Sequence, residues 1–226
     1  LLAEMERDNK YFYMGVFSSA ETVAACGVEF MAKLGIDFVW IGIESKQSMF
    51  AKTKGVDLKA MIQELRKHGI QVLGSAILFL DHHTKENIQE DIDFVIELET
   101  DFVQFMELGP LPGTALYKEY EADGRLLTEI PFEDWHGQDK IWFSHPHFTR
   151  EETHDYLKDA FRQDYERQGP SLLRLADTSL RGYRTMKSHA CPRLHAMQKR
   201  LSERCKPLRL LFPAIERFSE NNKTRD

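Results

Sequence analysis

Hydrophobic and polar positions divide the first half of the chain into short apolar runs and amphipathic stretches, and the central run is residues 38–43, Phe-Val-Trp-Ile-Gly-Ile. This run is apolar apart from one glycine, which is typical of a parallel strand that is buried on both faces. Two polar residues, Glu44 and Ser45, follow directly. Ligands bind at the carboxyl ends of strands in parallel α/β folds. The strand end is therefore a candidate site, and the alternative is a polar end that simply meets solvent.

Three further strands are predicted at residues 11–17, 70–80 and 102–108. Apolar residues at helical spacing predict helices between them, over residues 19–34, 58–68 and 84–98. Gly35 and Gly69 are placed to end the first two helices, and Thr84 is a credible N-cap for the third.

Strands that alternate with helical crossovers of similar length predict parallel connections, and hence an α/β fold. Both a doubly wound sheet and a (β/α) barrel fit this order. In either fold, polar residues at the strand ends, Ser18, Glu44 and Ser75 or Asp81, would converge at one edge with the turn of residues 109–114.

The pattern changes after residue 117. Residues 118–148 are rich in aromatic residues and histidine and lie between prolines, which predicts an irregular segment that covers the body. Residues 149–226 return to helical spacing, with a break at residues 169–171, a last segment at 192–218 and a frayed end. We expect three parts: residues 1–117, 118–148 and 149–226.

Composition fits a globular protein of 226 residues, 42% of them hydrophobic and 29% charged. The net charge of −6 divides into −11 for residues 1–150 and +5 for the remainder. The basic part has no dense Lys/Arg run, so we expect no nucleic-acid partner. The sequence has no apolar window of membrane-spanning length and no signal peptide, and we expect a cytoplasmic protein.

Three cysteines, Cys26, Cys191 and Cys205, have no metal-binding spacing, and we interpret Cys26 as a small buried thiol. The pairs His82–His83 and His145/His147 also lack a zinc-like partner spacing, and adjacent histidines on a loop are expected to point apart. The sequence therefore predicts no metal site.

Several short motifs together resemble a known family. They are Val39 to Ser45, Lys54-Gly55, Gly69-Ile70 leading into Gly74 to Leu78, Thr84-Lys85-Glu86 and Pro110 to Tyr117. In order and spacing they resemble the later strands of radical S-adenosylmethionine (SAM) enzymes, and most closely the cobalamin-binding branch. Residues 132–135, 145–147 and 160–172 are similar to the C-terminal extension of that branch.

The resemblance implies a partial (β/α) TIM-like barrel, containing strands three to six of a (β/α)6 radical SAM barrel, followed by a mainly helical C-terminal extension. It also implies that the first two strands, the Cys-x-x-x-Cys-x-x-Cys loop of the [4Fe–4S] cluster and the cobalamin domain are missing N-terminal parts of the same protein. The N-terminus reads as mid-chain sequence. We therefore expect the C-terminal portion of a longer enzyme, inactive by itself.

The implied chemistry is cleavage of SAM to a 5′-deoxyadenosyl radical, followed by methyl transfer or cyclisation on an unknown small or lipid-like substrate. The resemblance assigns Glu44 to the SAM ribose or amino-acid part and Ser75 to a second ribose contact. It places Pro112 and Gly113 beside the adenine, and Lys54 could reach the SAM carboxylate. No catalytic residue is assigned.

Phe79-Leu80-Asp81 replaces a glycine-containing turn of the family, which would place a phenylalanine side chain in the path of the ligand. Two alternatives to the radical enzyme stay open. One is a non-catalytic α/β interaction module, and the other is a different, doubly wound α/β enzyme. Sequential strand order would favour the barrel, whereas a switch in strand order would favour the doubly wound sheet.

Overall fold

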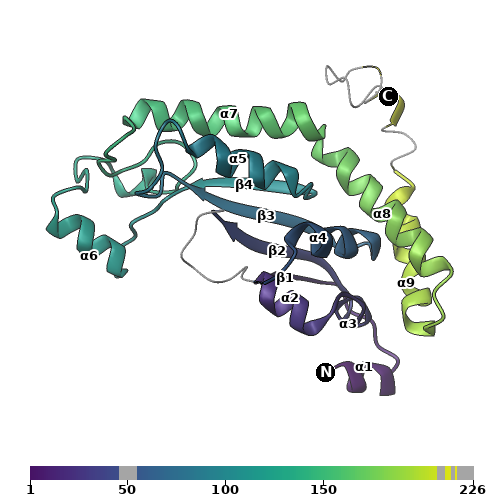
Figure 1. Ribbon diagram of the computed structural model, residues 1–226. Coiled ribbons are helices and arrows are strands. Elements are labelled where there is room, and N and C mark those ends of the chain that lie inside the picture. The colour runs from purple at the N-terminus through teal and green to yellow at the C-terminus, as the bar shows by residue number, and fades with distance from the viewer. Residues whose placement is uncertain (46–54, 208–211, 215–216, 218–226) are drawn as a thin grey trace.

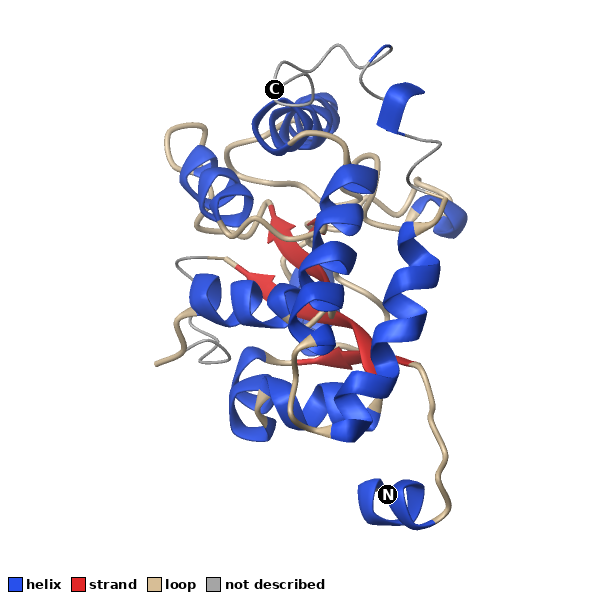
Figure 2. Ribbon diagram, turned by 90° about the vertical axis from the view of Figure 1, so that its right-hand side faces the viewer, coloured by secondary structure: helices blue, strands red, loops and turns tan. Residues whose placement is uncertain are grey.

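Four parallel strands form the centre of the computed structural model, which describes residues 1–45, 55–207, 212–214 and 217. The strands are β1 (Met14–Ser18), β2 (Ile36–Glu44), β3 (Gln71–Leu78) and β4 (Phe102–Glu107). They pair in the order β1-β2-β3-β4, so the described sheet has no switch point (Figure 1). The strand direction turns from one edge of the sheet to the other, as is usual for a twisted sheet (Figure 2).

Helices connect and cover the strands. Those in the first half of the chain are α1 (Leu2–Arg7), α2 (Ala20–Cys26), α3 (Val28–Leu34), α4 (Leu58–Lys67) and α5 (Ile88–Glu97). The second half contains α6 (Ala115–Ala122), a 3-10 turn (Phe132–Asp134), α7 (Arg150–Gln168), α8 (Ser171–Lys187) and α9 (Pro192–Cys205). No described helix is both long enough and apolar enough to span a membrane.

Two predicted helices differ from the structure. The helix expected over residues 19–34 is two helices, because Gly27 takes a φ of +78° and ψ of 137°, which no helix accommodates. The helix expected to start after Thr84 starts at Ile88. The backbone N–H of Thr84 donates to the Asn87 side chain at 2.7 Å, and the Thr84 hydroxyl accepts from the N–H of Glu86. The polar side chains thus form a turn in place of the first helical turn.

Only one face of the sheet is fully covered. Along β2, Val39, Ile41 and Ile43 are at most 2% exposed, whereas Trp40 and the other residues that alternate with them are half-buried. β3 shows the same strict alternation. The prediction that residues 38–43 are buried on both faces is therefore wrong, because helices α3, α4, α5 and α7 pack on one side of the strands.

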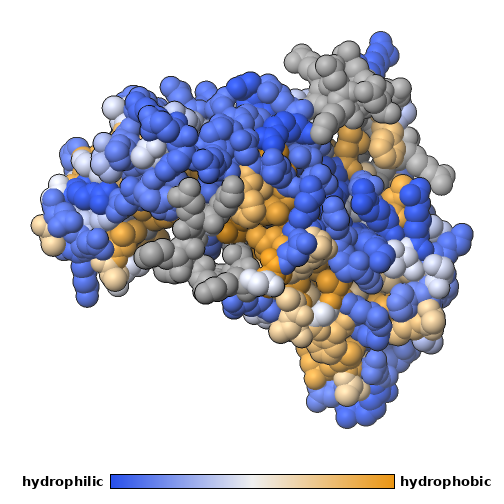
Figure 3. Space-filling view, viewed as in Figure 1, coloured by the Kyte–Doolittle hydropathy of each residue, from blue (hydrophilic) through white to orange (hydrophobic). Residues whose placement is uncertain are grey.

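Apolar surface accordingly remains accessible. Exposed large apolar side chains include Phe12, Tyr13 and Phe17, the last of which is 79% exposed on the edge strand β1. Hydrophobic surface is also gathered in the middle of the view in Figure 3 and is not spread evenly. Residues 11–13 do not join β1, although the sequence predicts a strand from residue 11, and the guanidinium of Arg200 in α9 lies 3.4 Å from the Tyr13 ring centre.

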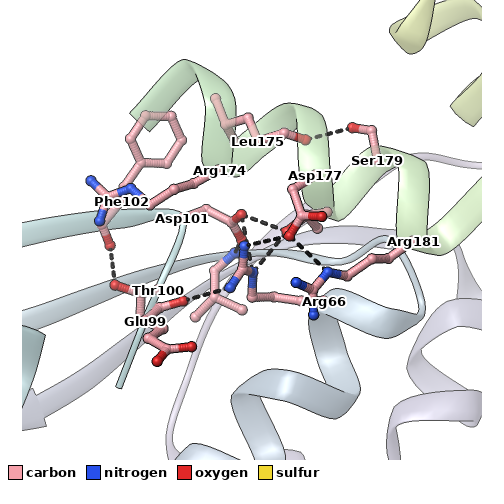
Figure 4. Close-up of polar contacts among 12 residues, drawn as sticks. Arg66, Glu99, Thr100, Asp101, Phe102, Arg174, Leu175, Asp177, Ser179 and Arg181 are labelled. Carbon is pink, nitrogen blue, oxygen red and sulfur yellow. Dashed lines mark hydrogen bonds and ion pairs between the residues drawn. The ribbon is translucent and has the colours of Figure 1, made fainter. Parts of the chain in front are cut away.

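Buried ionic contacts attach the C-terminal helices to the body at the amino ends of the strands. Arg66 of α4 donates to the Thr178 hydroxyl of α8 at 2.9 Å and to the Glu99 carbonyl at 2.9 Å (Figure 4). Fully buried Asp101 accepts from the backbone N–H of Val72 at 2.8 Å and from Thr178 at 2.6 Å. Charge and hydrogen bonds are therefore matched where α4, α8 and the turn before β4 meet.

The same junction requires two glycines. A Cβ atom on Gly182 of α8 would lie 2.3 Å from the Cα of Gly69, which follows α4. The two backbones therefore touch, and the missing side chains allow α8 to pack directly on the turn that leads into β3.

Candidate functional site

A cavity of about 710 Å³ lies on the open face of the sheet toward the carboxyl ends of the strands. Alternate residues of the strands form its floor: Phe17, Trp40, Gly42, Glu44, Ser75, Ile77, Gln104 and Met106. Gly109, Leu111 and residues of the covering segment, among them Trp135, His136 and Trp142, form a second wall. Its size is in the range of small-molecule sites.

Glu44 ends β2 in an unusual conformation. Its φ is +63°, and the pairing of β2 with β3 is irregular between Gly42 and Glu44. A Cβ atom on Gly42 would lie 2.7 Å from Oε1 of Glu44, so the carboxylate folds back over Gly42 on the cavity side. A left-handed backbone at a non-glycine residue costs about 1 kcal/mol or more and often marks a functional site. Gly42 provides the space that this side-chain position needs.

Ser75 lies next to this carboxylate. It is the β3 partner of Gly42 in the parallel register, and its hydroxyl donates to Oε1 of Gln104 on β4 at 3.5 Å. Paired residues on neighbouring strands are about 4.8 Å apart and point to the same face. The structure therefore brings Glu44 and Ser75 together at one cavity.

The other residues that the sequence predicts for the site, Lys54, Pro112 and Gly113, are not among the described residues that line the cavity. Lys54 lies outside the described residues. Pro112 and Gly113 belong to the turn after β4, with Gly113 at a φ of +87°, but the turn residues that line the cavity are Gly109 and Leu111. A Cβ atom on Gly109 would lie 3.0 Å from the Trp142 ring, so this glycine allows the ring to pack on the turn.

Phe79 does not enter the cavity, contrary to the expectation from its place in the sequence. It has a φ of +61°, is fully buried and packs edge-to-face on Phe148 with ring centres 5.2 Å apart. The left-handed backbone turns the side chain into the core behind the sheet end. The substituted turn therefore leaves the cavity open.

Asp81, in the same turn, fastens the covering segment. The Arg125 guanidinium donates to both carboxylate oxygens, and the Tyr120 hydroxyl donates to one of them at 2.8 Å. Hydrogen bonding to Arg125 holds the pKa of the Asp81 carboxyl below its usual value. The Arg125 guanidinium also lies 3.8 Å from the Tyr120 ring centre. The end of β3 and the segment after α6 are thus joined by a charged, stacked contact.

Glu107, at the end of β4, is a feature that the sequence interpretation missed. It is 3% exposed, and neither carboxylate oxygen has a hydrogen-bond partner among the described residues. The Thr153 hydroxyl donates to the Arg150 carbonyl and so has no hydrogen for Glu107. Burial raises the pKa of Glu107 to about 7. A carboxylate directly after an apolar strand, as at Glu44, is the sequence signal that could have identified it.

The histidines at residues 82 and 83 lie closer together than expected. Their ring centres are 4.5 Å apart, and a ligand atom of each lies within 4.8 Å of Asp91. However, Nδ1 of His83 accepts from the Leu80 N–H at 3.0 Å, so Nε2 carries the hydrogen that bonds Asp91 at 2.8 Å. Both nitrogens of His83 are therefore engaged, and this arrangement fits a structural hydrogen-bond chain better than a metal site.

Cysteines do not converge on any site. Cys26 is exposed, so its interpretation as a buried thiol is wrong: it is the last residue of the short helix α2. Cys191 and Cys205 flank the two ends of α9, which places them roughly 20 Å apart along the helix axis. The cysteines of this sequence therefore cannot together hold an iron–sulfur cluster.

No family model matches the chain. It is 28% identical over 141 residues, 62% of its length, to an uncharacterised methyltransferase of Pyrococcus horikoshii, covering 28% of that protein. Two proteins of Chlorobaculum tepidum also match 48% of the chain and 25% of their own length. They are bacteriochlorophyllide d C-8(2)-methyltransferase, at 34% identity, and bacteriochlorophyllide d C-12(1)-methyltransferase, at 26%. The chain thus spans about a quarter of the length of these relatives, and each of them is named as a methyltransferase.

Proposed function

We propose that this chain forms the SAM-facing wall of a methyltransferase of the radical SAM type, and that the cavity over β2 to β4 holds SAM. The observation that carries the proposal is the position of the Glu44 carboxylate, folded over Gly42 beside the Ser75 hydroxyl at the strand ends. The proposal is also supported by sequence similarity, because the relatives reported above are named as methyltransferases.

The roles proposed for the side chains follow from their chemistry. Glu44 accepts hydrogen bonds from the ribose hydroxyls or the ammonium group of SAM, and Ser75 adds a second contact to the ribose. The turn that contains Pro112 and Gly113 lies by the adenine, with Leu111 toward the cavity. Lys54 is proposed for the SAM carboxylate. When bound, SAM supplies the transferable methyl group or the adenosyl radical precursor.

Two features of the sheet support the barrel over a doubly wound sheet. The strand order is sequential, and the helices of the described residues cover one face only, which leaves an inner face lined by Trp40, Ser75 and Gln104. A doubly wound sheet has helices on both faces and a change of strand order at its ligand site. In a barrel, the uncovered face becomes the interior.

The iron–sulfur cluster of that enzyme branch is not accommodated by the cysteines of this sequence. Cys191 and Cys205 lie at the two ends of α9, and Cys26 is exposed at the end of α2. This separation favours a second candidate, in which the chain serves as a non-catalytic module that presents the cavity. Under the first candidate, a cluster would require cysteines other than the three in this sequence.

Isothermal titration of the chain with SAM tests the proposal. We expect saturable binding that Glu44→Gln weakens by about tenfold or more, since a hydrogen bond to a charged group contributes about 1.5–3 kcal/mol. Ser75→Ala should weaken binding less. Glu21→Gln, an exposed carboxylate at the start of α2, is the matched control and should bind as the wild type. Equal affinities for the wild type and Glu44→Gln would refute the proposed site.

A further inference from the structure

The walls of the cavity are unusually aromatic. All three tryptophans of the sequence line it, together with Phe17. Phe17 and Trp40 lie on the edge of the sheet formed by β1 and β2, with ring centres 4.7 Å apart. Trp135 and Trp142 lie on the opposite side, with ring centres 5.8 Å apart and planes only 12° from parallel.

The two aromatic groups are carried by different parts of the sheet. Trp40 is on β2, whereas Trp142 packs on Gly109, which follows β4. Because β3 lies between these strands, the backbone positions that carry the groups are two strand spacings apart, about 10 Å. This distance is comparable to the width of a fused polycyclic ring system. Between the groups, Gln104 offers a polar contact next to Ser75, the residue proposed for the SAM ribose.

The charged and aliphatic residues that line the cavity also limit the kinds of ligand that it can bind. No lysine or arginine occurs among the described residues that line the cavity, and its carboxylate-bearing residues are Glu44 and Glu107. A phosphorylated or otherwise multiply anionic ligand would therefore find no cation among these described lining residues. The aliphatic lining residues are few, Ile77, Met106 and Leu111, which does not favour an extended acyl chain.

We propose that the substrate carries a flat, conjugated and largely apolar ring system that lies between Trp40 and Trp135. This inference rests on the proposed function, which places SAM at Glu44 and Ser75 in the same cavity. Trp135 is the specificity-determining residue. It is half-buried, is held by stacking on Trp142, and its indole N–H donates to the Ile130 carbonyl at 3.2 Å. Aromatic rings attract one another beyond their burial by about 0.5–1.5 kcal/mol.

The test uses 1-pyrenemethanol, a flat uncharged four-ring probe, titrated against the chain. The ratio of the first to the third pyrene emission band falls when the probe enters apolar surroundings. We expect saturable binding that Trp135→Leu weakens by about two- to tenfold. Trp135→Phe, which keeps an aromatic ring, should recover most of the affinity. Circular dichroism of each variant checks that it is folded.

Phe132→Leu is the matched control, because Phe132 packs on Trp135 with ring centres 5.4 Å apart but is exposed and does not line the cavity. It should bind the probe as the wild type does, and 1-dodecanol should displace the probe only weakly. Unsaturable binding, equal affinity of folded Trp135→Leu, or efficient displacement by 1-dodecanol would each overturn the proposal.

A parallel titration with SAM separates the two proposals. If SAM binds and 1-pyrenemethanol does not, the substrate class is wrong and the SAM site stands. If the probe binds with the Trp135 dependence described and SAM does not bind, the ring site stands and the proposed function fails.

Discussion

Replacing Gly42 by alanine should separate ligand binding from stability. The added Cβ atom would lie 2.7 Å from Oε1 of Glu44, well inside contact distance, and the carboxyl carbon would be 3.6 Å away. Among the described residues, no other heavy atom outside the chain neighbours lies within 4 Å of it. Only a flexible carboxylate end therefore has to move, and the strand itself can stay in place.

The magnitudes follow from this geometry. Gly42 does not have a positive φ, so alanine is compatible with its backbone and should leave the free energy of unfolding unchanged or raise it by about 0.5–1 kcal/mol. Displacement of the carboxylate removes a charge-assisted hydrogen bond to the ligand, which corresponds to about tenfold weaker SAM binding or more. Urea unfolding and isothermal titration measure the two effects on the same samples.

Gly15→Ala is the matched control for this experiment. Gly15 lies on β1, and the nearest atoms to a Cβ there belong to the Phe38 side chain, at an ordinary 3.5 Å or more. It should show a similar change in stability and unchanged SAM binding. If Gly42→Ala binds SAM as tightly as the wild type, the carboxylate position over Gly42 is not the binding position, and the reasoning fails.

Three further predictions concern stability. Gly182→Ala should lower the free energy of unfolding by about 1–3 kcal/mol, because its Cβ would press on the backbone of Gly69; an unchanged urea midpoint would contradict the direct packing of the two backbones. Arg66→Met should lower the free energy of unfolding by about 3–5 kcal/mol, because buried Asp101 loses the cation paired with it. Thermal unfolding measures this loss, and an unchanged melting temperature would contradict the role of the ion pair. Glu107 has a pKa raised to about 7 in the folded chain, so its stabilising contribution is complete below pH 4.5 and is lost as the pH rises through 7. Glu107→Gln should remove up to about 3 kcal/mol of this pH dependence between pH 4.5 and 8, and parallel stability curves for variant and wild type would refute the assignment.

Periodicity alone was sufficient to predict most of the helical layer. The apolar residues Leu58, Met61, Ile62 and Leu65 all face the core in α4, and the break expected at residues 169–171 separates α7 from α8. These features depend on the spacing of apolar residues and on the residues at helix ends, both of which can be read from the sequence. The parallel sheet also follows from the alternation of strands and helices.

Long-range placement was harder to infer. The run at residues 38–43 is apolar whether helices cover both faces or one, so its pattern could not show that Trp40 faces an open cavity. The Phe79 side chain points into the core because its backbone is left-handed, and nothing about a phenylalanine in the sequence indicates that conformation. The sequence could place Glu107 at a strand end, but only the structure shows that this carboxylate is buried with no hydrogen-bond partner among the described residues.

A crystal structure of the chain soaked with SAM tests the central claim most directly. We predict electron density for the ribose between the Glu44 carboxylate and the Ser75 hydroxyl, with the adenine toward the turn after β4. Density for SAM elsewhere on the molecule, or a cavity that stays empty at saturating SAM, would contradict the account.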